Sequence, residues 1–278
     1  MGHFRIEKFG RTSILDFSEV AYGIAKEKID PYSSKFSKKK FTLQQHAVII
    51  CLKIRFGTTY VGIVERLVEE PRIRKALDLE EVPHPTTLVK AFERLETELW
   101  RVFLQASAEL LEKNGIVGVD ASGFERSHAS RHYTKRAKLH IKELKTTLLV
   151  DTEENAVIDV HITASRKHDT QIGPQLVKRT SKFIEILLGD KGYDDQDLRK
   201  LCHELGIRPL IKHREFTNLH KAWNVLLDDD LYGQRNQNES VNSTIGRKYD
   251  SSVFSRKWYK QFREIVAKCI VHNLDRAV

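Results

Sequence analysis

Apolar residues recur along the chain with two different periods, and the change falls near residue 114. From residue 42 to 114 the spacing is that of amphipathic helices. Thr42 stands where the N-cap of a first helix is expected, and Gly57 where that helix ends. A long helix is predicted to open at Thr86 or Thr87, with its apolar positions at Leu88, Phe92, Leu95, Leu99, Phe103, Ala106 and Leu110. Several short helices with tight turns favour a helix-turn-helix-like bundle, although a helical cap or dimerisation module fits the same pattern.

Beyond Gly115, short β-type runs replace the helical spacing. Ile116–Val119 predicts a strand, and residues 144–150 and 156–163 predict a hairpin across the polar turn between them. Two later strands, over 183–188 and 207–211, are separated by a helix and preceded by another, and the chain ends in a helix. The order predicts a mixed α/β sheet flanked by helices, with antiparallel strands first and parallel strands later. The ribonuclease-H-like fold has the same order.

The remaining part of the chain, residues 1–41, shows no clear period and carries a basic run at Lys35, Lys38, Lys39 and Lys40. We therefore expect an irregular basic arm over residues 1–41, a helical region over 42–114 and an α/β domain over 115–278. A basic run of this kind is usually a solvated surface, although contact with phosphates also fits it.

Composition narrows the class of protein and charge suggests the partner. Of 278 residues, 40% are hydrophobic and 31% charged, which excludes collagen-like and wholly disordered chains. Lys and Arg outnumber Asp and Glu by 47 to 38, and the net charge of +9 favours a polyanion such as nucleic acid. The longest apolar run, Ala47–Leu52, is too short for a bilayer, and the N-terminus has no apolar signal core. Three widely spaced cysteines support neither a disulfide framework nor a zinc site. We expect a soluble, cytoplasmic protein.

Two aspartates carry the candidate chemistry. Asp120 and Asp190 each follow an apolar strand directly, and α/β sheets place ligands at the edge where their strands end. If the two strands are neighbours, the carboxylates lie close together and repel each other unless a cation sits between them. Taken alone, either residue also fits a simple turn cap.

A third carboxylate is expected from the polar stretch over residues 232–242. Glu239 is the candidate, on a predicted helix whose amides and hydroxyls leave few apolar positions to bury. Such a helix suits a face turned toward a ligand or a nucleic-acid groove. Arg235 lies one turn before Glu239, so an ordinary i, i+4 ion pair is an alternative reading of both residues.

These pieces, taken in order, resemble the DDE transposases of prokaryotic insertion sequences. The block Gly189-Asp-Lys-Gly-Tyr-Asp194 is the most specific element, followed by the spacing of Tyr232, Arg235 and Glu239 in the subgroup with a tyrosine, arginine, glutamate and lysine signature. Asp120-Ala-Ser122, His168-Asp169 and the segment Val82–Leu88 are also similar to the family pattern. The family's lysine falls on Gly246, so Arg247 or Lys248 is expected to take over its contact with DNA. Contact of His168-Asp169 with the active site fits the return of the hairpin toward the sheet edge, and a cap by Asp169 on the helix that follows fits equally; of the two we expect the cap.

The resemblance implies a ribonuclease-H-like catalytic core over residues 115–278 and a DNA-binding role for the helices over 42–114. It implies that Asp120, Asp190 and Glu239 are catalytic and hold two Mg²⁺ ions, with Mn²⁺ as an alternative. It also implies double-stranded DNA partners, namely the inverted-repeat ends of an element and its target, and a homo-oligomer on DNA. The reaction would be phosphodiester hydrolysis followed by strand transfer. A nuclease of the same fold, or a non-catalytic DNA-binding protein from a decayed element, remains an alternative.

DNA contacts are expected mainly from the stretch after Asp120, where residues 121–148 hold seven basic side chains and two acidic ones. A solvated basic loop would explain the same charges. The full set of candidate DNA contacts is Arg126, Arg131, Lys135, Arg136, Lys138, Lys191, Tyr232, Arg235, Arg247 and Lys248.

Overall fold

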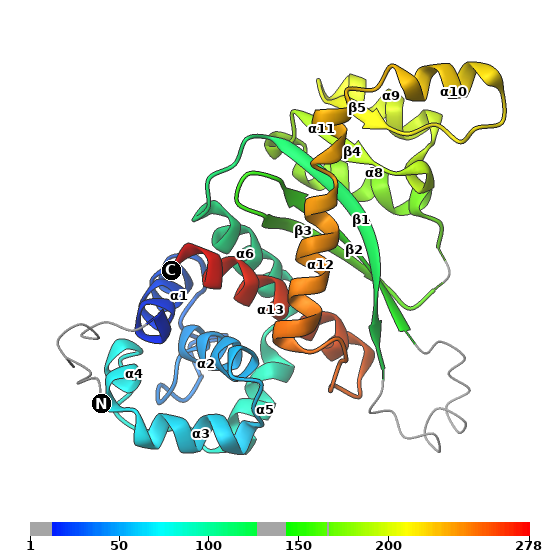
Figure 1. Cartoon of the computed structure of the whole chain (residues 1–278). Helices are drawn as coiled ribbons and strands as arrows, with labels where there is room; N and C mark the ends of the chain where they lie inside the picture. Colours follow the sequence, from blue (N-terminus) through cyan, green and yellow to red (C-terminus); the bar gives the residue numbers. More distant parts are fainter. Residues whose placement is uncertain (1–12, 127–142, 166) are drawn as a thin grey trace, which may run out of the picture. The chain divides into compact units, whose positions relative to one another are not determined.

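The computed structural model describes residues 13–126, 143–165 and 167–278 (Figure 1). The chain divides into two compact units. The first comprises the chain up to Leu110 together with Ile270–Val278, and the second comprises Leu111–Cys269. The candidate DNA contacts Arg131, Lys135, Arg136 and Lys138 lie outside the described residues.

The first unit is built from helices, and its first helix contradicts the expected irregular arm. Phe17, Ala21 and Ala25 follow one another at i, i+4 spacing on α1 and are fully buried, which is the reason the segment folds. The helices of this unit are α1 (Ser13–Lys28), α2 (Leu43–Arg55), α3 (Tyr60–Glu69), α4 (Pro71–Ala76), α5 (Pro85–Arg94), α6 (Thr97–Glu109) and the C-terminal end of α13 (Trp258–Ala277).

Helix ends in this unit follow local sequence signals, with one exception. Thr42 caps α2 in a reciprocal capping box with Gln45, as predicted, and Gly57 follows the helix with a φ of +59°. The predicted long helix is wrong, because the chain leaves helical geometry at Leu95, with a ψ of 99°. The structure has two helices there, α5 and α6, and each buries an apolar face. Across the break between them, the rings of Phe92 and Trp100 pack edge to face, with their centroids 5.8 Å apart.

The second unit is a five-stranded mixed sheet in the order β3-β2-β1-β4-β5. Its antiparallel pairs are β1–β2 and β2–β3, and its parallel pairs are β1–β4 and β4–β5, which confirms the predicted order. The strands are β1 (Ile116–Glu125), β2 (Glu143–Asp151), β3 (Ala156–Thr163), β4 (Ile186–Gly189) and β5 (Arg208–Ile211). The other elements are α8 (Asp169–Thr180), α9 (Gln196–Glu204), α10 (Asn218–Val225), α11 (Asp229–Gly233), α12 (Asn236–Tyr249) and the short turns η2 (Ser181–Phe183) and η3 (Lys191–Tyr193).

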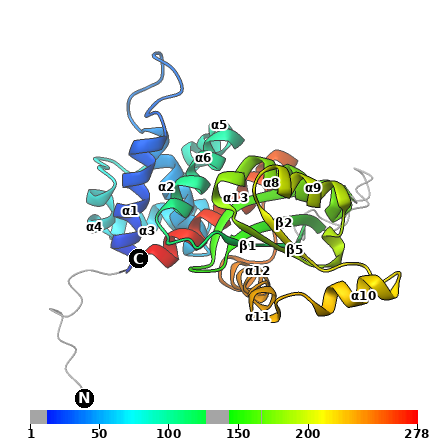
Figure 2. The same ribbon diagram turned by 90° about the horizontal axis from the view of Figure 1, so that it is seen from above.

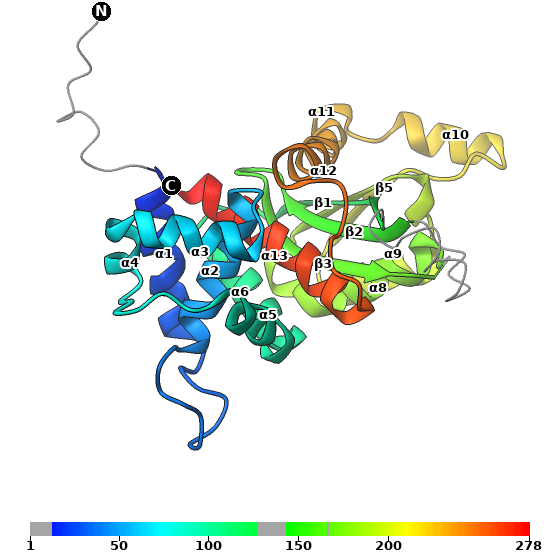
Figure 3. The same cartoon turned by 90° about the horizontal axis from the view of Figure 1, so that it is seen from below.

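Helices cover both faces of the sheet, and the two faces differ in chemistry. Figures 2 and 3 show α8 and α9 on one face and α12 on the other. The face under α8 and α9 is apolar, with Val117, Val119 and Leu187 packed against Ile172 and Leu198. The strand β1 is longer than predicted, because its pairing with β2 continues past Asp120 to Glu125. Asp120 therefore lies within β1, at the level where its other neighbour, β4, ends.

Among the described residues, no single helix is long and apolar enough to cross a membrane. The helices α2 and α3 reach the required length and apolarity only as a pair, and they are bent by 102° at the break between them.

Candidate active site

Every second residue of β1 faces α12, and these residues build one wall of the site. Gly118, Asp120 and Ser122 share this face because side chains of a strand alternate between its two sides. Asn242 of α12 donates a hydrogen bond from Nδ2 to Oδ2 of Asp120 at 3.4 Å. The hydroxyl of Ser122 donates to Oδ1 of the same amide at 3.1 Å. The amide of Asn242 is thereby held between two neighbouring positions of β1 and helps to orient Asp120.

Asn238 fixes α12 against the sheet one turn earlier. Its side chain is fully buried, and its Nδ2 donates to the carbonyl of Gly118 at 2.9 Å and to that of Leu148 at 3.4 Å. A Cβ on residue 118 would lie 2.0 Å from Oδ1 of Asn238, so only glycine fits this close approach. Asn238 precedes Glu239 in the chain, so its contacts fix the part of α12 from which Glu239 projects.

Asp190 stands beside Asp120, directly after the end of the neighbouring strand β4. The parallel register pairs Val119 with Gly189, so the two aspartates follow equivalent positions of β1 and β4. Asp190 caps the short turn η3 by accepting a hydrogen bond from the amide of Gly192 at 2.8 Å. The hydroxyl of Tyr232 donates to the carbonyl of Gly189 at 3.3 Å and ties α11 to the end of β4. The two strands are thus neighbours, as the sequence predicted, although Asp120 lies within β1 and only Asp190 follows a strand end.

Glu239 reaches Asp120 through an arginine rather than directly. Nη2 of Arg235 lies 2.9 Å from Oε1 of Glu239, and its Nη1 lies 3.8 Å from Oδ1 of Asp120. The i, i+4 ion pair expected as an alternative is therefore formed, and the same guanidinium also contacts the first aspartate. The Glu239 side chain is 61% exposed, whereas that of Arg235 is 18% exposed.

The electrostatics of the site centre on Asp120. Burial raises the pKa of its carboxyl above the usual value, and the nearby charges of Asp190 and Glu239 act in the same direction. The guanidinium of Arg235 and the backbone amide of Ala121 oppose that shift in pKa. Burial likewise raises the pKa of the Tyr193 hydroxyl, next to Asp169, Asp120 and Asp190. Several negative charges therefore meet at this site, and the guanidinium of Arg235 contacts two of them, Asp120 and Glu239.

A fourth carboxylate, Asp169, approaches the same turn. The expectation that Asp169 caps α8 is wrong: it is the first helical residue, the N-cap is His168, and that cap makes no side-chain hydrogen bond. Asp169 instead pairs with Lys145 at 2.8 Å. A Cβ on Gly192 would lie 2.9 Å from Oδ1 of Asp190 and 3.4 Å from Oδ2 of Asp169, so both carboxylates flank this glycine. This approach agrees with the alternative expectation that His168-Asp169 reaches the active site, and it depends on how α8 docks.

The described basic candidates occupy different environments. Arg126 is buried, and so is Tyr232, which belongs to α11. Lys191 pairs with Glu215 at 2.6 Å. Arg247 and Lys248 are exposed in the last turn of α12. A hollow of about 400 Å³ beside them is lined by Ser122, Gly123, Phe124, Asn242, Ser243, Gly246, Arg247 and Ser251. Their contact with DNA stays a prediction.

The carboxylates fit a divalent cation in part. Asp120 and Asp190 lie on adjacent strands and offer the oxygen ligands that Mg²⁺ prefers. Within the described ranges no three His, Cys, Asp or Glu side chains are arranged to hold a metal ion, and Glu239 pairs with Arg235. A complete ligand set would require Glu239 to leave that ion pair.

A protein-family profile described as "Transposase DDE domain" matches residues 112–274, which is more than half of the chain. The chain belongs to this family of DDE transposases. The match begins at the start of the second unit and contains the strands β1 to β5, with Asp120, Asp190 and Glu239. The assignment of these three residues as catalytic rests on their placement and on the sequence motif.

Comparison with solved structures returned the cryo-EM structure of a piggyBac transposase synaptic complex with hairpin DNA. It aligns with 97% of this transposase and 75% of its own chain, at a TM-score of 0.47 and 10% sequence identity. No curated protein matches this transposase in sequence.

Proposed function

We propose that this transposase cuts DNA at the ends of its own element and joins the freed 3′ ends to target DNA. The observation that carries the proposal is the pair Asp120 and Asp190 on adjacent strands, with Glu239 linked to Asp120 through Arg235. The net charge of +9 suits the polyanionic substrate. We place the protein in the cytoplasm, with the nucleoid, and expect it to act as a homo-oligomer that holds two DNA ends.

We further infer that the element is a prokaryotic insertion sequence of the subgroup with the tyrosine, arginine, glutamate and lysine signature. Tyr232, Arg235 and Glu239 support this inference, because they lie at the family spacing on α11 and at the start of α12. The lysine position falls on Gly246 in α12, and the exposed Arg247 and Lys248 stand next to it.

The carboxylates of this chain would act as ligands and positioning groups. Asp120 would contact both of two Mg²⁺ ions, or Mn²⁺ in their place, while Asp190 and Glu239 would each contact one. When bound, such ions activate the attacking oxygen and offset the charge on the leaving oxygen. Asn242 keeps Oδ2 of Asp120 oriented. Arg235 would exchange Glu239 for a DNA phosphate, which frees the glutamate to join the aspartates.

Cleavage of a labelled duplex that carries the DNA flanking the transposase gene tests the proposal. We expect nicking with Mg²⁺ or Mn²⁺ and a loss on the order of 10³-fold in each of Asp120→Asn, Asp190→Asn and Glu239→Gln. Glu204→Gln is the matched control, because Glu204 is exposed on α9 and only pairs weakly with Lys200 at 3.9 Å. Unchanged nicking in Asp120→Asn would refute the assignment.

Adding a second duplex to the same reaction separates transposition from simple hydrolysis. Products in which the cut end is joined to the second duplex support strand transfer. Nicked products alone would mean a nuclease that does not transfer strands. Metal-independent binding without any cut product would mean a non-catalytic DNA-binding protein.

A further inference from the structure

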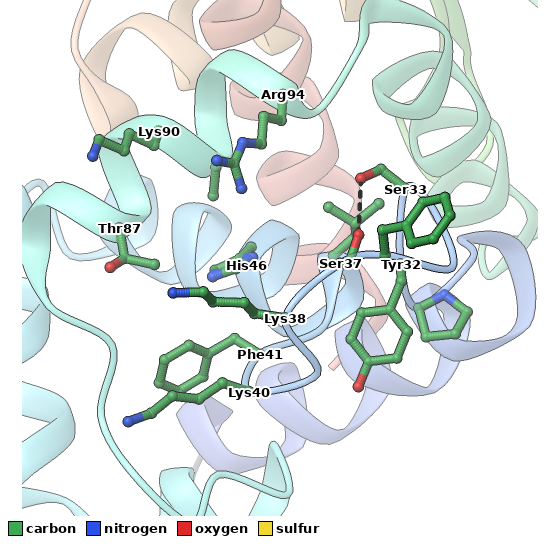
Figure 4. A pocket seen from close by; sticks show the side chains of 14 residues that line it. Tyr32, Ser33, Ser37, Lys38, Lys40, Phe41, His46, Thr87, Lys90 and Arg94 are labelled. Atoms are coloured by element: carbon green, nitrogen blue, oxygen red, sulfur yellow. Dashed lines mark hydrogen bonds between the residues drawn. The ribbon is translucent and has the colours of Figure 1, made fainter.

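A basic pocket in the first unit lies between α5, α2 and the segment that precedes α2 (Figure 4). Its volume is about 520 Å³, in the range of sites that hold small organic ligands. The lining residues are Pro31, Tyr32, Ser33, Phe36, Ser37, Lys38, Lys40, Phe41, Leu43, His46, Thr87, Lys90, Ala91 and Arg94. This described lining holds four cationic side chains and no Asp or Glu.

The four cationic side chains come from two segments of the chain, α5 and the segment that precedes α2. Thr87, Lys90 and Arg94 follow one another along α5 at i, i+3 and i+7 and so share one face of that helix. Lys38 and Lys40 belong to the segment opposite, and Lys40 also pairs with Glu81. In Figure 4, Arg94, His46 and Lys38 point toward the same hollow. An anionic group in the hollow would offset a concentration of positive charge that this lining does not balance.

His46 gives an independent reason to expect a ligand. Its side chain lies on α2 with a relative exposure of 8%, and neither ring nitrogen has a hydrogen-bond partner. Burial, with the nearby charge of Arg94, lowers the pKa of the His46 ring to about 4, so the ring is neutral at pH 7. A neutral imidazole offers one N–H donor and one acceptor. Buried polar atoms are nearly always hydrogen-bonded in native proteins, so a bound group is the expected partner.

The aromatic residues of the pocket indicate that its ligand is larger than a phosphate ion. Phe41 packs against the His46 ring at a centroid distance of 5.9 Å, and Phe36 is 85% exposed at the rim. Tyr32 also lines the pocket. Aromatic side chains beside cations form the usual platform for an unpaired base and its phosphate. The volume is also much larger than one phosphate requires.

We propose that this pocket binds one unpaired nucleotide, with its phosphate among Lys38, Lys90 and Arg94 and its base against the aromatic residues. His46 contacts the ligand through a ring nitrogen. The proposal rests on the proposed function for the source of the nucleotide, which is a DNA strand; a free nucleotide offers the same chemistry. It adds to that function a contact for unpaired DNA that lies outside the catalytic unit.

Binding to the full-length protein, measured without divalent metal, tests the proposal apart from cleavage. The probes are fluorescein-labelled dT12, for which anisotropy is measured, and dTMP as a competitor. We expect Lys90→Ala/Arg94→Ala to weaken dT12 binding at least about tenfold and to reduce the salt slope by roughly 1.4, or 0.7 for each lost contact. Lys75→Ala/Lys178→Ala is the control, because it removes two exposed charges from α4 and α8, outside the pocket.

Two further readouts separate recognition of a nucleotide from general charge attraction. Phe36→Ala removes an exposed ring and leaves the charge unchanged, and we expect it to weaken dT12 binding at least about fivefold. The ring signals of His46 in NMR spectra should shift saturably with dTMP, and the pKa of His46 should rise when the phosphate is bound.

The outcomes are distinct. Binding of both dT12 and dTMP, weakened by the pocket variants, supports an unpaired nucleotide of DNA, whereas binding of dTMP alone supports a free nucleotide and overturns the DNA source. Equal affinity of the pocket and control variants, or His46 signals that do not move, would overturn the proposal. A phosphoserine peptide that competes as strongly as dTMP would overturn the assignment to a nucleotide. These binding experiments measure no DNA cleavage. A negative result would therefore overturn the pocket proposal and leave the proposed function to be decided by the cleavage test.

Discussion

The two faces of β1 show how one strand serves two purposes. Val117 and Val119 point into the apolar core beneath α8 and α9. Gly118, Asp120 and Ser122 alternate with them and meet α12 through hydrogen bonds and one ion pair. The apolar face is stabilised by burial, which depends on area and only loosely on direction. The polar face depends on atoms placed within a few tenths of an ångström.

This difference predicts how substitutions on each face of β1 affect the protein. Substitutions on the apolar face should alter stability and leave the chemistry of each folded molecule intact. Substitutions on the α12 face should alter activity even where stability is little affected, because they move or discharge the carboxylates.

The largest effect on stability is expected from Leu187→Ala. Leu187 is fully buried in the apolar cluster, one strand away from Val117. We expect a loss of about 2–5 kcal/mol in the free energy of unfolding, from lost burial and the cavity that remains. Urea unfolding measures the loss. The cleavage rate, corrected for the folded fraction, should match that of the wild type. A lower corrected rate would contradict the claim that the apolar face of β1 affects stability alone.

A smaller effect is expected from the close approach of β1 and α12. Gly118→Ala forces a Cβ against Oδ1 of Asn238 and should cost about 1–3 kcal/mol. Asn238→Ala removes two hydrogen bonds to buried carbonyls and should cost a similar amount. The double variant should be more stable than the sum of the two losses predicts, because the alanine at 238 removes the clash.

Simple additivity of the two losses in urea unfolding would show that the two residues do not constrain each other. Both single variants should also reduce cleavage beyond their effect on folding, since Asn238 sets the position of Glu239. Cleavage that falls only in proportion to the folded fraction would contradict that positioning role.

Asp120→Asn should stabilise the protein at neutral pH while it abolishes cleavage. Burial raises the pKa of Asp120 in the folded state, so the ionised carboxylate opposes folding above that pKa. Removing the charge should add on the order of 1 kcal/mol, reduced by the lost contact with Arg235. The gain should shrink as the pH falls from the raised folded pKa through the usual pKa of Asp, because the wild-type carboxyl then takes up its proton. Urea unfolding at several pH values measures this, and a gain that grows at acidic pH would contradict it.

The smallest effect concerns Gly246, which stands where the proposed subgroup signature would have its lysine. A Cβ at this position would meet only Cβ of Ser251, at 3.7 Å, so a side chain fits. Gly246→Lys should add about 0.5 kcal/mol through helix propensity and the favourable charge near the end of α12. It should also tighten binding to DNA ends, and Gly246→Ala is the control for propensity alone. Equal DNA affinity of the two variants would mean that Arg247 or Lys248 already supplies the contact.

Local signals explain what the sequence could predict. The hairpin and the later strands follow from short apolar runs, and the meeting of Asp120 and Asp190 follows from two such runs that pair in parallel. Thr42 and Gly57 mark the ends of α2 because caps act through neighbouring backbone atoms. The apolar runs and the caps depend on residues close together in the chain, whereas Asp120 and Asp190 are far apart and meet because two locally recognisable strands pair as neighbours.

Features that depend on docking were missed or mistaken. The extension of β1 to Glu125 comes from pairing with β2, since Ala121, Ser122 and Gly123 give no apolar period. The contact between Asn238 and Gly118 joins residues 120 positions apart, and no local pattern indicates it. Asp169 was expected to cap a helix, whereas its position beside Asp190 depends on how α8 packs on the sheet.

Titration of Mn²⁺ into the full-length protein, followed by calorimetry, tests the central claim most directly. The account predicts saturable binding in the wild type, loss of that binding in Asp120→Asn and Asp190→Asn, and weaker binding in Glu239→Gln. It also predicts tighter binding in Arg235→Gln, because that variant frees Glu239 from its ion pair. Equal Mn²⁺ affinity in the wild type and Asp120→Asn would contradict the claim that these acids form one cation-binding site.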